Sequence, residues 1–227
     1  MIKAEKIIKK YKSGGGELVV LKELNLHVNP GEFLAITGRS GSGKSTLLYQ
    51  LGLLDHPNSG SIIIEGIDVS KLSLDERTKF RLEELGYVFQ DYALLPELTA
   101  SENVILPLLM QGKSKKQAKV EAIEALEKVG LGGKINNLPS QLSGGEQQRV
   151  SIARAIGHNP KIIFADEPTA NLDSETADTV MKTFIDLHKA GQTIVMVSHE
   201  PEYAKLADRT IALSDGIISH EIINNNH

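Results

Sequence analysis

The segment from Gly38 to Ser45, GRSGSGKS, has the residue types and spacing of a phosphate-binding loop. Four apolar residues, Phe33 to Ile36, predict a buried strand before it, and a helix is predicted after it from Thr46 to Leu54. Glycine lets the backbone turn tightly, so that successive N–H groups converge on phosphate oxygens at the helix start. We therefore expect a nucleoside triphosphate to be bound by Gly38, Arg39, Ser40, Gly41, Ser42, Gly43, Lys44, Ser45 and Thr46.

Lys44 and Ser45 carry the chemistry of this loop. The ammonium of Lys44 is suited to neutralise the β and γ phosphates, and the hydroxyl of Ser45 is suited to a Mg²⁺ ligand position. A flexible Gly/Ser loop without a ligand is the alternative. It does not account for Lys and Ser directly after the last glycine, between a strand and a helix.

Four candidate elements, the loop among them, follow predicted strands at their carboxyl ends. Open parallel sheets bind ligands at that edge, so we expect these elements to share one site. Besides the loop they are Gln90 after Tyr87–Phe89, Asp166 with Glu167 after Ile162–Ala165, and His199 after Val195–Val197.

Each of these residues has a predicted role and a plainer alternative. Asp166 is predicted to hold Mg²⁺, although a strand-end aspartate is often only a turn or capping residue. Glu167 is predicted to deprotonate the water that attacks the γ-phosphate, and its alternative is a surface carboxylate. His199 is predicted to hydrogen-bond the γ-phosphate or that water, and Gln90 to contact Mg²⁺ or water. The other six histidines show no metal-ligand spacing.

The run from Leu142 to Arg149, LSGGEQQR, offers a second phosphate-binding surface. Ser143 and Glu146 form a capping box, so an ordinary helix start is the plain alternative. That alternative leaves Gly144 and Gly145 unexplained, because glycine inside a helix costs about 1 kcal/mol relative to alanine. A phosphate that approaches the backbone would explain these two glycines. The loop Gly38 to Ser45 already holds the phosphates of this chain's own nucleotide. We therefore expect this surface to take the γ-phosphate of a second copy of the chain.

Composition bounds the class of protein. The chain has 227 residues, so one or two domains are expected. It has no cysteine, which excludes disulfides and thiolate metal sites. Its net charge of −4 gives no general attraction to nucleic acid. The charged start argues against a signal peptide, and the longest apolar run, Val104 to Met110, is too short to span a membrane. These features predict a soluble intracellular protein whose membrane attachment would require a protein partner.

The remaining pattern predicts layers. Alternating apolar residues at Ile2 and Ala4 and at Leu24, Leu26 and Val28 predict antiparallel strands around a turn at 14–16, and 60–66 predicts a further strand of that layer. From about 91 to 155 the pattern is helical. It includes a helix capped by Ser114 and Gln117, with Ala122, Leu126 and Val129 on one face and Gly130 at its end. Residues 224–227 are expected to be a disordered tail.

Taken in order, these motifs closely resemble the nucleotide-binding subunit of ATP-binding cassette (ABC) transporters over nearly the whole chain. Glu146 in the signature is typical of the lipoprotein-release, macrolide-export and cell-division branch. The matching motifs are Tyr11, the phosphate-binding loop, Gln90 in the Q-loop, LSGGEQQR as the signature, IIFADEP as Walker B, Asn171–Asp173 as the D-loop and His199 as the switch histidine.

The resemblance implies an α/β P-loop NTPase fold with a mixed, RecA-like sheet core, an antiparallel β subdomain and an inserted helical subdomain. We expect one ATPase domain over 1–223, with its core in 1–90 and 156–223 and the helical part at about 91–155. Tyr11 is expected to stack on adenine, although it could be only a half-buried strand residue. Asp173 is expected to contact nucleotide.

The resemblance also implies partners. Two cassettes are expected to close around two MgATP, and hydrolysis to reopen them, driving a separate membrane permease at the cytoplasmic face of the membrane in export or extraction. Leu94, Leu95 and Pro96 are expected to help dock the permease, with a place in the core of the helical subdomain as the alternative.

Other functional classes fit less well. Cassettes of DNA repair need long coiled-coil arms, which the roughly one hundred residues between loop and signature do not supply. Translation-type cassettes usually carry two loops per chain, and a P-loop kinase or GTPase would not account for the signature together with His199. An ATPase of a cell-division or mechanotransmission complex, which acts on partners without moving a solute, stays open.

Overall fold

The computed structural model describes residues 1–13 and 16–224 and divides the chain into two compact units. One unit comprises Met1–Lys79 with Gly191–His227, and the other comprises Phe80–Ala190. The boundary falls inside helix α2 (Leu74–Glu84). The strand that precedes Glu167 belongs to the same unit as the helices of the signature region, and the expected subdomain bounds stay a prediction.

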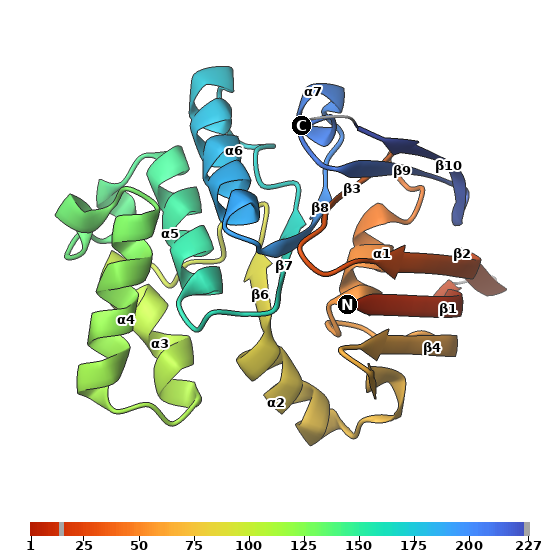
Figure 1. Ribbon diagram of the computed structural model, residues 1–227, viewed down its shortest axis with the longest axis horizontal. Coiled ribbons are helices and arrows are strands. Elements are labelled where there is room, and N and C mark those ends of the chain that lie inside the picture. The colour runs from red at the N-terminus through yellow and green to blue at the C-terminus, as the bar shows by residue number, and fades with distance from the viewer. Residues whose placement is uncertain (14–15, 225–227) are drawn as a thin grey trace. The chain divides into compact units, whose positions relative to one another are not determined.

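The first unit contains an antiparallel sheet in the order β2-β1-β4-β5 (Figure 1). Ile2 pairs with Val28 and Ala4 with Leu26, and all four side chains are buried, so the alternation does place one apolar face in the core. The predicted strands are confirmed, while residues 14 and 15 of the predicted turn lie outside the described residues. The strands are β1 (Ile2–Ser13), β2 (Gly16–Val28), β4 (Ser59–Ile64) and β5 (Ile67–Asp68).

The same unit contains four strands in the order β10-β9-β3-β8. β3 pairs in parallel with β8 and β9, and β10 pairs antiparallel with β9. The strand at the phosphate-binding loop is thus central, with parallel neighbours on both sides. These strands are β3 (Phe33–Gly38), β8 (Thr193–Val197), β9 (Arg209–Ser214) and β10 (Ile217–Ile223).

The helices of the first unit are short. α1 (Lys44–Leu51) ends three residues before the predicted end at Leu54, because Gly52 caps it and Leu53 takes a left-handed φ of 60°. The 3₁₀ helix η1 (Val69–Lys71) and helix α7 (Pro201–Ala204) complete the regular structure of this unit.

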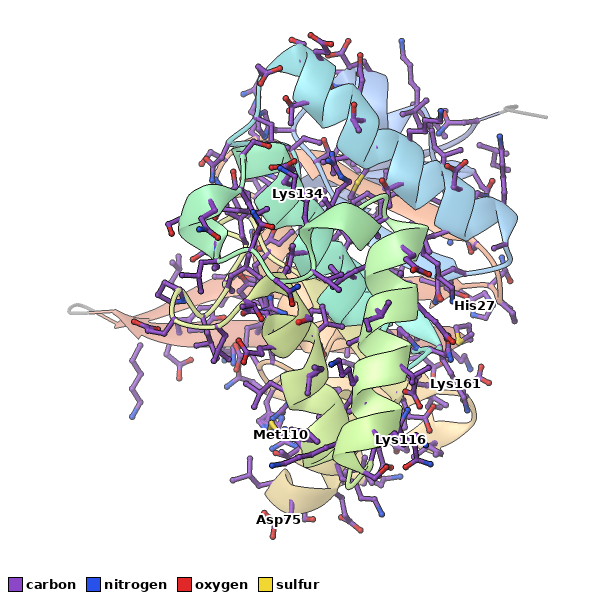
Figure 2. The ribbon with its side chains drawn as sticks, turned by 90° about the vertical axis from the view of Figure 1, so that its left-hand side faces the viewer. His27, Asp75, Met110, Lys116, Lys134 and Lys161 are labelled. Carbon is purple, nitrogen blue, oxygen red and sulfur yellow. The ribbon has the colours of Figure 1, made fainter. Side chains whose placement is uncertain are left out.

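The second unit joins two parallel strands to a layer of helices. β6 (Leu85–Val88) pairs with β7 (Ile162–Asp166), and α3, α4 and α5 lie side by side (Figure 1). The helices are α3 (Ala100–Met110), α4 (Lys115–Lys128), α5 (Gly144–Ile156) and α6 (Ser174–Lys189), with 3₁₀ turns η2 (Gly132–Lys134) and η3 (Pro139–Gln141). Met110 and Lys116 mark the end of the layer where α3 passes to α4 (Figure 2).

The local signals predicted for α4 are present. Ser114 and Gln117 form a capping box, so the helix starts where its first free N–H groups find side-chain acceptors. Ala122, Leu126 and Val129 are buried, as the periodicity predicted. This agreement shows that the apolar stripe and the cap were read correctly from the sequence.

Asn224 is part of the folded chain and corrects the expected start of the tail. Its Nδ2 donates to the carbonyl of Ala207 at 2.9 Å and to Oγ1 of Thr210 at 3.0 Å. Residues 225–227 lie outside the described residues. Within residues 1–13 and 16–224, no helix is both long and apolar enough to cross a membrane.

Candidate functional site

The phosphate-binding loop is closed by its own lysine. Nζ of Lys44 donates to the carbonyl of Gly38 at 3.0 Å and to that of Arg39 at 3.2 Å, and Lys44 is buried. The ammonium is therefore held within the loop between β3 and α1. A positive charge in this position is suited to phosphate oxygens, which would compete with the two carbonyls for its donors.

The backbone of the loop requires glycine. Gly38 has a φ of 142°, and a Cβ there would come within 2.3 Å of the carbonyl oxygen of Leu213. Gly43 has a φ of 101° and caps α1 without a side chain that could accept from the first turn. Oγ of Ser42 is buried and has no hydrogen-bond partner within the described part of the chain. An anion at the start of α1 would satisfy these groups.

His199 leaves the sheet at the same edge as the loop. Ile36 of β3 is in register with Val197 of β8, and N of Ser198 donates to the carbonyl of Ile36 at 3.1 Å. His199 is the next residue and is exposed. The structure thus brings the histidine and the loop to neighbouring strand ends, as the sequence predicted.

The acidic pair occupies the equivalent edge in the second unit. Asp166 is the last residue of β7 and is buried, and Glu167 follows with a left-handed φ of 46°. This conformation costs a residue with a Cβ about 1 kcal/mol or more, and such strain is concentrated at functional sites. It turns the chain sharply at the point where the carboxylate of Glu167 leaves the strand.

Gln90 lies near this edge as well. Val88 of β6 is in register with Ala165 of β7, so the chain emerges from both strands at one level. Nδ2 of Asn171 donates to the carbonyl of Gln90 at 2.9 Å, which joins the D-loop to the Q-loop. Each unit therefore gathers its own predicted residues, the loop and His199 in one, and Gln90, Asp166 and Glu167 in the other.

The signature begins with the predicted capping box. N of Glu146 donates to Oγ of Ser143 at 3.3 Å, and N of Ser143 donates to Oε2 of Glu146 at 2.9 Å. This hydrogen bond from the Ser143 backbone holds the pKa of Glu146 below its usual value, with help from Lys134, whose Nζ is 3.5 Å away. Lys134 is labelled in Figure 2.

The two glycines of the signature lie against side chains of the same chain. A Cβ on Gly144 would lie 2.9 Å from the hydroxyl of Tyr92, and one on Gly145 would lie 2.1 Å from Cγ2 of Thr176. Both contacts are with ends of side chains, so the approach of a phosphate to these glycines stays a prediction.

Asp173 has a structural task of its own. It caps α6, with Oδ1 accepting from N of Thr176 at 3.0 Å and Oδ2 accepting from Oγ1 of Thr176 at 2.8 Å. The hydrogen bond from the Thr176 backbone is the main reason that the pKa of Asp173 is lowered. Thr176 therefore uses its hydroxyl to hold the D-loop and its methyl group to contact the signature.

Two residues of α5 that the sequence did not single out hold the neighbouring loops. Nε2 of Gln148 donates to the carbonyl of Pro168 at 2.8 Å, next to Glu167. The guanidinium of Arg154 donates to the carbonyls of Tyr92, at 3.0 Å, and Ala93. Tyr92 and Ala93 both have positive φ, which no residue type there signals. The position of Gln148 and Arg154 on the signature helix was the only sequence signal that could have identified them.

The segment after Gln90 is exposed in the second unit. Leu95 is 44% exposed, Pro96 is exposed and Leu94 is half-buried. These residues are therefore not part of the core of the helical layer, which was the alternative to a docking role. Their docking role stays a prediction.

Tyr11 lies on β1 and is 40% exposed. Its hydroxyl donates to Oδ2 of Asp55 at 2.8 Å. An exposed ring anchored at its hydroxyl is able to stack on a flat ligand. Asp55 was not among the predicted site residues, because a lone aspartate after a helix carries no distinctive spacing.

Comparison with known proteins gives the family. The family described as "ABC transporter" matches residues 21–170. The chain belongs to the ABC transporter family. The predicted resemblance is thereby confirmed, and the cassette is an ATP-binding protein of that family.

Relatives narrow the branch. The cassette is 47% identical over 216 residues to the uncharacterized ABC transporter ATP-binding protein YvrO of Bacillus subtilis (strain 168), covering 95% of this chain and 94% of that one. It is 51% identical over 203 residues to the lipoprotein-releasing system ATP-binding protein LolD of Aquifex aeolicus (strain VF5), covering 89% and 91%. It is 44% identical over 225 residues to the macrolide export ATP-binding/permease protein MacB of Rhodopirellula baltica (strain DSM 10527 / NCIMB 13988 / SH1), covering 98% of this chain and 33% of that one.

Solved structures support the fold and the activity. The cassette MJ0796, in a dimeric post-hydrolysis state bound to ADP and Pi, matches with a TM-score of 0.91 and 42% identity over 100% of both chains. The P-loop NTPase fold of the ABC ATPases is thus confirmed. The cassette is an ABC ATPase, which converts ATP and water to ADP and phosphate.

Proposed function

We propose that the cassette powers a separate membrane permease by closing as a dimer around two MgATP and reopening after hydrolysis, in export or extraction. The observation that carries this proposal is the similarity over the whole length of both chains to a cassette solved as a dimer with ADP and Pi. The names of LolD and MacB, which are systems for lipoprotein release and macrolide export, support the direction.

In this proposal each motif residue has one role at the bound nucleotide. The loop and Lys44 bind the phosphates, while Ser45, Gln90 and Asp166 supply oxygen ligands for Mg²⁺. A hydroxyl, an amide and one carboxylate fit this ion, because Mg²⁺ usually keeps waters and phosphate oxygens beside one or two carboxylates. In the part of the chain that the structure describes, no group of three or more His, Asp or Glu forms a self-contained metal site. When bound, Mg²⁺ neutralises charge that develops on the phosphates.

Glu167 is the proposed general base. It accepts the proton of the water that attacks the γ-phosphorus, as the bond between that phosphorus and the oxygen bridging to the β-phosphate breaks, and the products are ADP and phosphate. His199 donates a hydrogen bond to the γ-phosphate or to the water. The left-handed backbone at Glu167 supports the role, because strained backbone is concentrated at functional sites.

The second copy of the chain completes each site. Two cassettes face each other head to tail, and the start of α5 of one approaches the γ-phosphate held by the other. A helix start has N–H groups and a positive dipole end that suit an anion. The residues proposed to contact the partner's nucleotide are Ser143, Gly144, Gly145, Glu146 and Asp173.

The permease is the proposed membrane partner. Its cytoplasmic segments dock on the exposed stretch around Leu95, which places the cassette at the cytoplasmic face of the membrane without inserting into it. Nucleic acid is not a proposed partner, because the net charge of −4 gives no electrostatic attraction to it.

Two measurements test the proposal. The purified cassette should hydrolyse MgATP, and Lys44→Ala should abolish nucleotide binding. The tagged cassette, purified from native membranes in mild detergent, should retain an integral membrane protein that mass spectrometry identifies, and Leu95→Glu should release it while nucleotide binding is kept. Purification without any membrane protein, in the presence and absence of ATP, would contradict the role in powering a permease.

A further inference from the structure

Asp55 joins the strand of Tyr11 to the far end of the helix that starts in the phosphate-binding loop. The hydroxyl of Tyr11 donates to Oδ2 of Asp55 at 2.8 Å, and Asp55 follows α1, which begins at Lys44. N of Asp55 donates to the carbonyl of Tyr49, so this turn is tied to the helix. An eight-residue helix spans about 12 Å, and α1 therefore acts as a rigid spacer between the loop and Asp55.

The carboxylate of Asp55 is itself held in place. Its Oδ1 accepts from Nζ of Lys9 at 2.7 Å and from N of His56 at 2.7 Å. Burial alone would raise the pKa of Asp55, but the hydrogen bonds from Lys9 and Tyr11 outweigh burial and lower it. The group thus stays charged at neutral pH and remains an acceptor for the hydroxyl of Tyr11.

Lys9 distinguishes the two faces of the tyrosine ring. Its Nζ lies over the ring, 4.9 Å from the centroid, and also donates to the carbonyl of His56 at 2.7 Å. Lys9 is buried, whereas Tyr11 is 40% exposed. Because the ammonium occupies one face, a flat ligand has only the other face on which to stack.

We propose that Asp55 and Lys9 are positioning residues that fix the ring of Tyr11, so that adenine is bound on the ring face opposite Lys9. This inference rests on the proposed ATP site and adds residues that no motif assigns to it. An unanchored exposed ring would lose side-chain freedom when a base stacks on it. An anchored ring has lost that freedom before the ligand arrives, so Asp55 contributes to base affinity without touching the base.

The test separates base binding from phosphate binding. Isothermal titration calorimetry with MgATP and with magnesium tripolyphosphate compares wild type, Asp55→Ala and Tyr11→Phe, which removes only the hydroxyl. We expect each variant to weaken MgATP about fivefold, the order expected for one net hydrogen bond, with tripolyphosphate unchanged. Asp55→Ala should add little in the Tyr11→Phe background, because both changes remove the same interaction.

Asp68→Ala is the matched control. Asp68 belongs to the same unit, is similarly half-exposed and pairs with Lys71 at 2.7 Å, and its removal should change neither ligand's affinity. An unchanged MgATP affinity in Asp55→Ala, or equal losses for both ligands, would overturn the inference. Failure of the proposed function would give a different result. Neither MgATP nor tripolyphosphate would bind wild type, or Lys44→Ala would bind both ligands as tightly as wild type does.

Discussion

The methyl group of Thr176 lies where a side chain on Gly145 would begin, since a Cβ on Gly145 would come within 2.1 Å of Thr176 Cγ2. The hydroxyl of the same threonine donates to Asp173 at 2.8 Å. One side chain therefore joins the start of the signature helix to the start of α6.

This contact allows the role of Gly145 to be tested directly. Gly145→Ala should lower the free energy of unfolding by about 2 kcal/mol, a usual cost of overpacking. Adding Thr176→Ser should restore most of it, because the methyl is removed and Cβ of Thr176 is 3.5 Å from the new side chain. Urea unfolding and ATPase rate are measured together. Restored stability without restored activity would show that a ligand, and not only Thr176, needs the glycine.

The loop offers a pair of glycines with different constraints. Gly38→Ala should destabilise the fold by more than about 2 kcal/mol, because its Cβ would meet a backbone oxygen that cannot move aside. Gly41→Ala should cost only about 1 kcal/mol of backbone strain, since its φ is 77° but nothing lies within 4 Å of a Cβ. Thermal unfolding of both variants checks the order. Equal losses would mean that steric contact at Gly38 is not the constraint.

Arg154 should control the left-handed segment after Gln90. Arg154→Met keeps much of the side-chain volume and removes the donors to the carbonyls of Tyr92 and Ala93. We expect a loss of about 2 kcal/mol, typical of hydrogen bonds from a charged group, and faster amide exchange around Tyr92. Hydrogen exchange with mass spectrometry measures the latter. Arg149→Met on the same helix is the control, and an equal effect of both variants would argue against a specific role of Arg154.

Glu167→Gln should keep nucleotide binding and lose turnover. The amide cannot accept the proton of the attacking water, so kcat should fall roughly 10²- to 10⁴-fold while the affinity for MgATP stays within about twofold. Single-turnover hydrolysis and calorimetry make the comparison. Glu175→Gln, an exposed residue in the first turn of α6, should behave as wild type. Near-normal hydrolysis by Glu167→Gln would remove this residue as the base.

Much of this architecture follows from local patterns in the sequence. The alternation at Ile2 and Ala4 predicts one buried sheet face, and the apolar run Ile162–Ala165 predicts a buried strand, because these patterns report burial directly. The observed strand ends one residue later, at Asp166. Helix α6 was not identified, although Ala177, Val180, Met181 and Phe184 recur at helical spacing and are all buried.

The missed contacts have a different origin. Thr176, Arg154 and Asp55 act on residues far away in the chain or on backbone carbonyls, and neither spacing nor composition reports such pairs. The glycines of the signature indicate a tight approach to the backbone, but the sequence does not identify the approaching group. A glycine in the sequence indicates that another group comes close to the backbone, but it does not identify that group.

The shared site is tested most directly by the mass of the Glu167→Gln protein in solution with MgATP, measured by light scattering with and without the added change Ser143→Arg. We expect a dimer for Glu167→Gln and a monomer for Glu167→Gln with Ser143→Arg, with MgATP affinity of the monomer retained. A dimer that persists with Ser143→Arg, or a Glu167→Gln protein that binds MgATP and stays monomeric, would contradict a site completed by the signature of a second chain.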